Sequence, residues 1–279
     1  MKVGLVLEGG AMRGMYTAGV LDTFMENGIL VDSIVGVSAG ALFGVNYLSG
    51  QIGRVIRYNK KFNGDKNYMG LRPLLREGNI VGTKYAYHDV PRELDPFDDE
   101  TYKQSEIPFY AVITDIESGE PEYVQIKSVF EQIDTLRASG SMPFVSKPVK
   151  IGNRQYLDGA VSDSIPYEWL LKQGYDKIIV VLTRDIAYRK KSLSKILVNL
   201  CYRKYPKLKE RLMGRHTMYN ESVARLTELE KQNSVFVIRP SAPIEIGKIE
   251  KDPDKLQSVY ELGVSDMLAC LQKLKAYMA

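Results

Sequence analysis

Residues 33–48 of this 279-residue chain read SIVGVSAGALFGVNYL, and this stretch decides how the remaining sequence is interpreted. Its first five residues form an apolar, β-branched run typical of a buried strand, and the residues from Ala39 onward favour a buried helix. The junction between them has the pattern G-x-S-x-G. Glycines two residues before and after a serine, here Gly36 and Gly40, leave room for a strained turn that raises the Ser38 hydroxyl above the sheet edge. The context therefore favours Ser38 as a nucleophile over a tight turn without chemistry.

Strand and helix patterns alternate along the chain on both sides of this stretch. Such alternation predicts an α/β fold whose mostly parallel sheet is covered by helices on both faces. Residues 64–105 lack periodicity, and we expect them to form an irregular, lid-like insertion with short helices. We expect strands at 2–7, 33–37, 107–113, 122–126, 177–182 and 234–238 and one ending at Leu157, and helices at 13–27, 39–48, 54–62, 130–138, 166–173 and 254–277.

No linker or internal repeat separates a second domain, so the sequence predicts one domain over residues 1–279. Within it we distinguish a motif-bearing core at 3–183, a basic helical region at 187–230 and a C-terminal strand and helix at 234–277. The composition, 44% apolar and 26% charged, excludes a disordered or collagen-like chain.

The two cysteines, Cys201 and Cys270, are too few and too distant in sequence for a zinc site or a disulfide framework. We therefore expect no metal and no cofactor. The apolar start of the chain reaches Glu8 too soon for a signal peptide, and residues 33–48 are shorter than a membrane span. These features favour a cytoplasmic protein.

Positive charge is concentrated in one part of the chain. Residues 187–215 hold ten Lys or Arg and a single acid, Glu210, so this basic block has a net charge of +9 in a chain of net charge +4. Leucines interleaved with the basic residues favour a solvated helical cap over the sheet. The alternative is a surface that contacts an anionic membrane, at which the protein would be peripheral. No nucleic-acid motif accompanies the block, and we expect no nucleic-acid partner.

A second motif lies between the first expected strand and the first expected helix. A dinucleotide-binding fingerprint would need a glycine at position 11, and a phosphate loop would need Gly-Lys-Ser/Thr; both are absent. A glycine-rich loop at this place presents backbone N–H groups to an anion. It is suited to stabilising an oxyanion on an acyl group at Ser38, because both turns belong to neighbouring βα units. The loop consists of Gly9, Gly10, Ala11, Met12, Arg13 and Gly14.

Attack by a serine at neutral pH needs a base, and histidine is the usual one. The order Ser38, Asp158, His216 matches the triad order of α/β-hydrolases. However, Ser38 follows only the second expected strand, whereas the elbow of that fold comes after several strands. His216 ends the basic block and His88 lies in the irregular region, so both are more typical of surface or packing residues.

The chain resembles the patatin-like phospholipases, also called lipid acyl hydrolases, over residues 3–183. The resemblance rests on the glycine loop, the G-x-S-x-G and Asp158-Gly159-Ala160, in this order. It implies a Ser38–Asp158 dyad, oxyanion donors from the glycine loop and a three-layer α/β/α fold. Small neighbours, Gly159 and Ala160, let the chain turn sharply beside Asp158. Ala11 stands where many members of the family have a third glycine.

The same resemblance implies a calcium-independent serine hydrolase that cleaves acyl esters of lipids through an acyl-enzyme. Its partner would be a lipid or another acyl ester substrate. Two alternatives stay open. An ordinary Ser-His-Asp esterase or thioesterase would need His88 or His216, and a non-catalytic α/β binding protein would need neither.

Overall fold

Eight strands form one sheet in the computed structural model, which describes residues 1–279. Their spatial order is β5-β6-β3-β2-β1-β7-β8, and β4 also pairs with β3. Pairing is parallel from β3 through β2, β1 and β7 to β8, and antiparallel for the pairs β3/β4, β3/β6 and β5/β6. The strands are β1 (Val3–Leu7), β2 (Ser33–Val37), β3 (Phe109–Asp115), β4 (Pro121–Gln125), β5 (Val149–Ile151), β6 (Arg154–Asp158), β7 (Lys177–Val181) and β8 (Val235–Ile238).

Ten α-helices connect or flank these strands, and none of them combines the length and the apolar character needed to cross a bilayer. They are α1 (Met15–Glu26), α2 (Ala39–Leu48), α3 (Arg54–Phe62), α4 (Leu71–Glu77), α5 (Asp99–Gln104), α6 (Ile133–Ser139), α7 (Tyr167–Lys172), α8 (Lys195–Cys201), α9 (Pro206–Lys231) and α10 (Pro253–Met278). Two short 3-10 turns, Ala11–Gly14 and Gly159–Val161, and a π-helix, Tyr85–Leu94, complete the elements.

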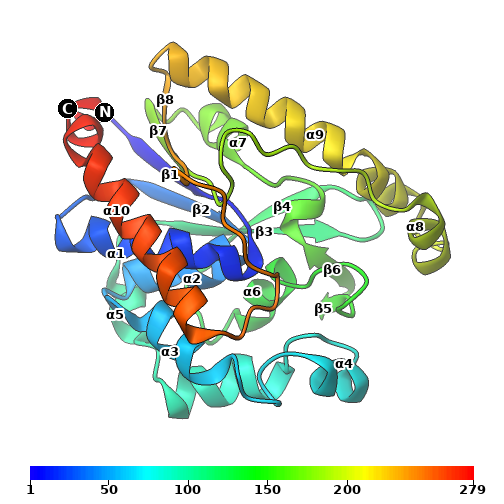
Figure 1. Ribbon diagram of the computed structural model, residues 1–279. Helices are drawn as coiled ribbons and strands as arrows, with labels where there is room; N and C mark the ends of the chain where they lie inside the picture. Colours follow the sequence, from blue (N-terminus) through cyan, green and yellow to red (C-terminus); the bar gives the residue numbers. More distant parts are fainter.

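Alternate side chains of the central strands enter two separate hydrophobic cores, because successive side chains of a strand point to opposite faces. Leu5 and Leu7 of β1 belong to the larger core with residues of α1, α2, α3 and α10, whereas Val6 belongs to a second core with residues of α7 and α9. Figure 1 shows the first group of helices on one side of the sheet and α7 and α9 on the other. The predicted three-layer α/β/α architecture with a mostly parallel sheet is confirmed.

Local predictions differ in accuracy along the chain. The strand at 33–37 and the helix at 39–48 are confirmed at both ends, and residues 64–105 contain only the short helices α4 and α5 and the π-helix. The predicted start of the helix at 13–27 was wrong, because its first turn is a 3-10 turn in which Ala11 has a left-handed φ of 49°. The sequence reasoning also missed β5, a strand of three residues that contains a lysine.

Helices α1 and α10 cross at a pair of glycines. A Cβ atom added at Gly19 would lie 2.2 Å from the carbonyl oxygen of Tyr260, and one added at Gly263 would lie 2.1 Å from that of Tyr16. The backbones of the two helices are therefore in direct contact, and the C-terminal helix covers the N-terminal one, as Figure 1 shows. Since β8 also extends the central sheet, we infer that residues 1–279 form one domain.

Substitution of Gly263 by Ala is expected to lower the free energy of unfolding by about 1–3 kcal/mol, the usual cost of overpacking. Gly214→Ala in α9 is the matched control, because nothing lies within 4 Å of a Cβ at that position. Its expected effect is a gain of up to about 1 kcal/mol from helix propensity. Urea unfolding followed by circular dichroism measures both. Equal stability of the two variants would contradict the close crossing of α1 and α10.

Candidate active site

The register of the sheet brings Ser38 and Asp158 to the two sides of β3. Val37 pairs with Val112, so Ser38 follows at the level of Ile113, and Ile113 pairs with Asp158 on the other side. Strand β6 runs antiparallel to β3 but pairs only with its last three residues, so Asp158, the last residue of β6, still lies near the edge where the parallel strands end. The two side chains therefore meet above β3 although 120 positions separate them in the sequence.

Ser38 occupies a strained turn between β2 and α2. Its backbone has φ 55° and ψ −120°, a region that residues with a Cβ rarely adopt. The N–H of Ser38 donates a hydrogen bond of 2.9 Å to the hydroxyl of Ser139, and its carbonyl accepts bonds of 3.0 Å from Ala41 and Leu42. A Cβ at Gly40 would lie 2.3 Å from the Leu7 carbonyl oxygen, so only glycine fits there. These contacts fix the direction of the serine side chain.

The Ser38 hydroxyl donates a hydrogen bond of 2.9 Å to Oδ2 of Asp158. The second oxygen of this carboxylate accepts a bond of 2.9 Å from the N–H of Ala160. Both side chains are buried, and burial raises the pKa of Asp158, although Arg215, the Ala160 N–H, the Ser38 hydroxyl and Lys190 act in the opposite direction. A raised pKa makes the ionised carboxylate a stronger base than an exposed aspartate.

Neither histidine comes into contact with this pair. Nδ1 of His216 pairs with the carbonyl oxygen of Met213 at 3.0 Å on α9, and Nε2 lies 3.5 Å from the hydroxyl of its neighbour Thr217. His88 belongs to the π-helix, and neither ring lines a cavity that contains Ser38. The arrangement that a Ser-His-Asp triad requires is not formed.

The glycine loop lies directly against Ser38. A Cβ added at Gly9 would be 2.8 Å from Cβ of Ser38, so a side chain there would displace the serine. The N–H groups of Gly9 and Gly10 have no acceptor within the protein, whereas the N–H of Arg13 donates to the Gly10 carbonyl at 3.2 Å. Free N–H groups beside a nucleophile can stabilise a developing negative charge, whereas the N–H of Arg13 is already used.

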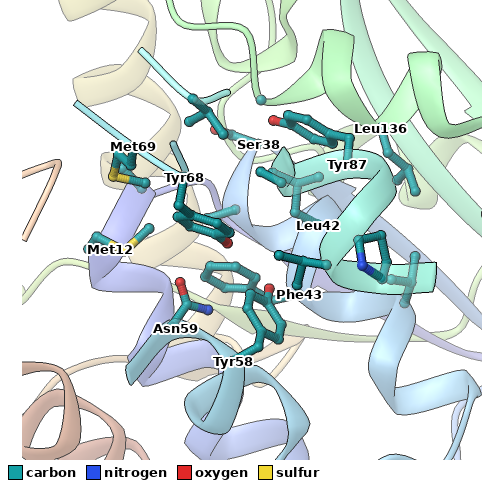
Figure 2. A pocket seen from close by; sticks show the side chains of 18 of the residues that line it. Met12, Ser38, Leu42, Phe43, Tyr58, Asn59, Tyr68, Met69, Tyr87 and Leu136 are labelled. Atoms are coloured by element: carbon teal, nitrogen blue, oxygen red, sulfur yellow. The ribbon is translucent and has the colours of Figure 1, made fainter. Parts of the chain in front are cut away.

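Two cavities of opposite character share Ser38 and Ala11 in their walls. The first is apolar. Figure 2 shows Ser38 at one end of it and Tyr58 and Asn59 at the other, with Leu42 and Phe43 between them. The sequence predicted an irregular insertion at residues 64–105 but indicated no role for its aromatic residues. Side chains of this region line the apolar cavity: Tyr68, Met69, Val81, Tyr87 and Val90.

Nine of the 21 residues that line the second cavity are charged, and Asp158 is one of them. Part of the basic block lies here, beside Ser38: Arg189, Lys190, Lys191 and Arg215. Further cations are Arg184, which lies just before the basic block, and Arg13 and Lys248 from distant parts of the chain. No periodic pattern in the sequence indicates this cavity, because its seven cations come from four separate segments.

Two family models match parts of this chain. The family model described as patatin-like phospholipase matches residues 5–171, and a model for a domain of unknown function, DUF6363, matches residues 205–279. The uncharacterized protein YjjU of Escherichia coli is 28% identical over 187 residues, which are 65% of this chain and 52% of that protein. This chain therefore spans about half the length of that relative.

Two further relatives and one solved structure are similar. The probable lipid hydrolase 463L of Invertebrate iridescent virus 6 is 23% identical over 82% of this chain and 89% of its own length. Lysophospholipase nte1 of Aspergillus fumigatus is 29% identical over 64% of this chain but only 12% of its own length. The structure of VipD from Legionella pneumophila aligns with 98% of this chain and 67% of its own at a TM-score of 0.46 and 13% identity.

Substitution of Asp158 by Asn is expected to stabilise the protein at neutral pH while it removes the carboxylate beside Ser38. Because the pKa of Asp158 is raised in the folded state, folding favours its protonated form. The carboxyl group therefore contributes stability below its unfolded pKa of about 3.9, and this contribution is lost as the pH rises through the folded value. Asn keeps the neutral shape at every pH, so the variant should melt at a higher temperature than the parent at pH 7 but not at pH 3.

Asp163→Asn is the matched control, since burial also raises the pKa of Asp163, which accepts a hydrogen bond from Tyr123 away from Ser38. It should gain stability in the same pH range and keep any activity of the parent. Thermal melts from pH 3 to pH 8 measure the effect. A lower melting temperature of Asp158→Asn at pH 7 would contradict a carboxyl group whose burial opposes its ionisation.

Proposed function

This chain belongs to the patatin-like phospholipase family, and on that premise we propose that it hydrolyses acyl esters of lipids with Ser38 as nucleophile and Asp158 as base. The observation that carries the proposal is the hydrogen bond of 2.9 Å from the Ser38 hydroxyl to a buried carboxylate. The names of two relatives, a probable lipid hydrolase and a lysophospholipase, support lipid esters as the substrate class. The apolar cavity that begins at Ser38 supports the same class, because an acyl chain can occupy it.

The reaction follows from the geometry in two halves. Asp158 takes the proton of the Ser38 hydroxyl while Oγ attacks the ester carbonyl carbon, and the free N–H groups of Gly9 and Gly10 stabilise the oxyanion. When the tetrahedral intermediate collapses, the C–O bond to the alcohol breaks, and Asp158 gives its proton to the departing alkoxide. An acyl group is then attached to Ser38.

Hydrolysis of the acyl-enzyme repeats these steps with water as the nucleophile. Asp158 accepts a proton from water, hydroxide adds to the acyl carbon, and the second tetrahedral intermediate forms at the same donors. Its collapse releases the fatty acid and returns the proton from Asp158 to Oγ of Ser38. Every proton transfer therefore uses one carboxyl group, for which a pKa raised by burial is suited.

The basic block also supports peripheral contact with an anionic lipid surface. Helix α8 exposes Ile196 and Leu200, of which 81% and 77% are accessible to solvent, beside the exposed cations Lys195, Arg203 and Lys204. Exposed apolar side chains bordered by cations are the combination by which peripheral proteins contact anionic lipids. We extend the proposal to such contact through residues 187–215.

A serine-reactive fluorophosphonate is expected to label Ser38, as located by mass spectrometry of the digested protein. Ser38→Ala should abolish labelling, and both Ser38→Ala and Asp158→Asn should lower ester hydrolysis by more than about a thousandfold, the usual effect of losing a nucleophile or its base. His216→Ala and His88→Ala are the controls and should keep the activity of the parent. Loss of activity in either histidine variant would favour a triad, and the absence of both labelling and hydrolysis would favour a binding protein.

The double substitution Ile196→Ser and Leu200→Ser is expected to weaken binding to vesicles that contain anionic phospholipid by at least about tenfold, since two large apolar side chains no longer enter the lipid. Sedimentation with vesicles measures the bound fraction. Leu268→Ser on α10 is the matched control, because Leu268 is also exposed but lies outside the basic block. Binding that is indifferent to anionic lipid and to the double substitution would contradict contact through this block.

A further inference from the structure

The cavity on the polar side of Ser38 is lined by cations that have no acidic partner. Seven Lys and Arg side chains line it, and none of them forms a salt bridge within the protein. Six come from the segments around residues 13, 184–191 and 215, and the seventh, Lys248, lines both this cavity and the apolar one. So many like charges in one cavity repel one another, and an anion would remove that cost.

The two acidic residues of this cavity offset only part of the charge of its seven cations. Glu8 is buried, and its carboxylate accepts bonds of 2.6 Å from the Thr183 N–H and 2.8 Å from the Tyr219 hydroxyl. Asp158 accepts bonds from Ser38 and Ala160. Both carboxylates are thus engaged with neutral donors, and an excess of positive charge remains in the cavity.

The side chains of Arg13, Arg184 and Lys190 are partly buried and donate no hydrogen bond within the protein. Of the other cations, Arg189 donates to the Ile186 and Tyr188 carbonyls and Arg215 to the Ala160 carbonyl. Nε of Arg13 is buried without a hydrogen-bond partner. The Arg184 guanidinium lies 4.0 Å from the ring centre of Tyr188, and the Lys190 ammonium lies 4.1 Å from that of Tyr219. Burial, followed by the charges of Arg215, Arg13 and Arg184, lowers the pKa of Lys190 to about 7. Glu8 is the acid that opposes this shift.

We propose that this cavity binds the phosphate of an anionic phospholipid whose scissile ester lies at Ser38 and whose acyl chain occupies the apolar cavity. The inference rests on the proposed function and names its substrate class. Ser38 lines both cavities, as a nucleophile must if the ester joins an apolar chain to a charged headgroup. In a glycerophospholipid only a few bonds separate ester and phosphate, so both groups of one molecule can reach the two cavities.

The chemistry of the cavity distinguishes among headgroups. Guanidinium groups match phosphate oxygens with two parallel N–H donors, and four of the seven cations are arginines. A choline headgroup adds a positive charge that these residues would repel. A neutral glyceride leaves all of them without a counter-charge. A phosphate monoester, with up to two negative charges, fits the cavity best.

Three monomeric esters with the same acyl chain test the inference: a monoacylglycerol phosphate, the corresponding lysophosphatidylcholine and the monoacylglycerol. We expect kcat/KM for the monoacylglycerol phosphate to exceed that for the monoacylglycerol by at least about tenfold. Arg184→Gln should lower this ratio by about tenfold. Arg189→Gln should also lower it, because Arg189 lines the same cavity; its side chain is exposed. The control Arg225→Gln removes a cation of α9 that pairs with Glu168 outside the cavity, and it should keep the ratio.

Calorimetry of Ser38→Ala with glycerol 3-phosphate and with inorganic phosphate separates the inference from the proposed function. Binding of glycerol 3-phosphate that is weakened by Arg184→Gln would support the phosphate site, whether or not the parent protein hydrolyses any ester. Absence of hydrolysis would then overturn only the hydrolase proposal. Equal hydrolysis of the three esters would overturn the phosphate site and leave the hydrolase proposal intact. Inorganic phosphate binding with no preference for the phosphate-bearing ester would assign the cavity to a free anion and overturn the lipid substrate.

Discussion

The hydrogen bond between the Ser38 hydroxyl and the Asp158 carboxylate is the contact on which the other features of the site depend. It exists because the sheet register places the two residues on either side of Ile113, at the edge where the parallel strands end. The strained turn at Ser38 and the pairing of β6 with only the last residues of β3 both contribute to this meeting. In the proposed mechanism burial makes Asp158 a stronger base, because a less hydrated carboxylate holds a proton more strongly.

The same pair lies at the boundary between two environments. On one side the aromatic and aliphatic residues contributed by α2, α3 and the region 64–105 form a mostly apolar cavity. On the other side the loop after β7, the glycine loop and α9 bring unpaired cations together. Lipid esters have this same division, with an apolar chain and a polar headgroup joined at the carbonyl carbon. The site thus presents to the reacting atoms the two environments that such a molecule connects.

The sequence predicted the parts of this arrangement that depend on local spacing. The motif at Gly36–Gly40, the alternation of strands and helices and the glycine loop are short-range patterns, and the fold they indicate is the one observed. The antiparallel direction of β6 could not be predicted, because the residue pattern of a strand of five residues does not depend on the direction in which it pairs. The sequence did not indicate that part of the basic block lies beside Ser38, where Arg13 and Lys248 join it in space from distant segments. The association of Ser38 with Asp158 came from the order of three motifs, and its geometry depends on strand pairing that spacing does not encode.

The central claim is that a buried carboxyl group, with no histidine, activates Ser38. The most direct measurement is the rate of acylation of Ser38 by an activated ester in single turnovers, recorded as a function of pH for the parent and for His216→Ala and His88→Ala. The account predicts one ionisation, above the ordinary aspartate value of about 3.9, that is the same in all three proteins. An ionisation near 6.5 that disappears with either histidine would contradict it.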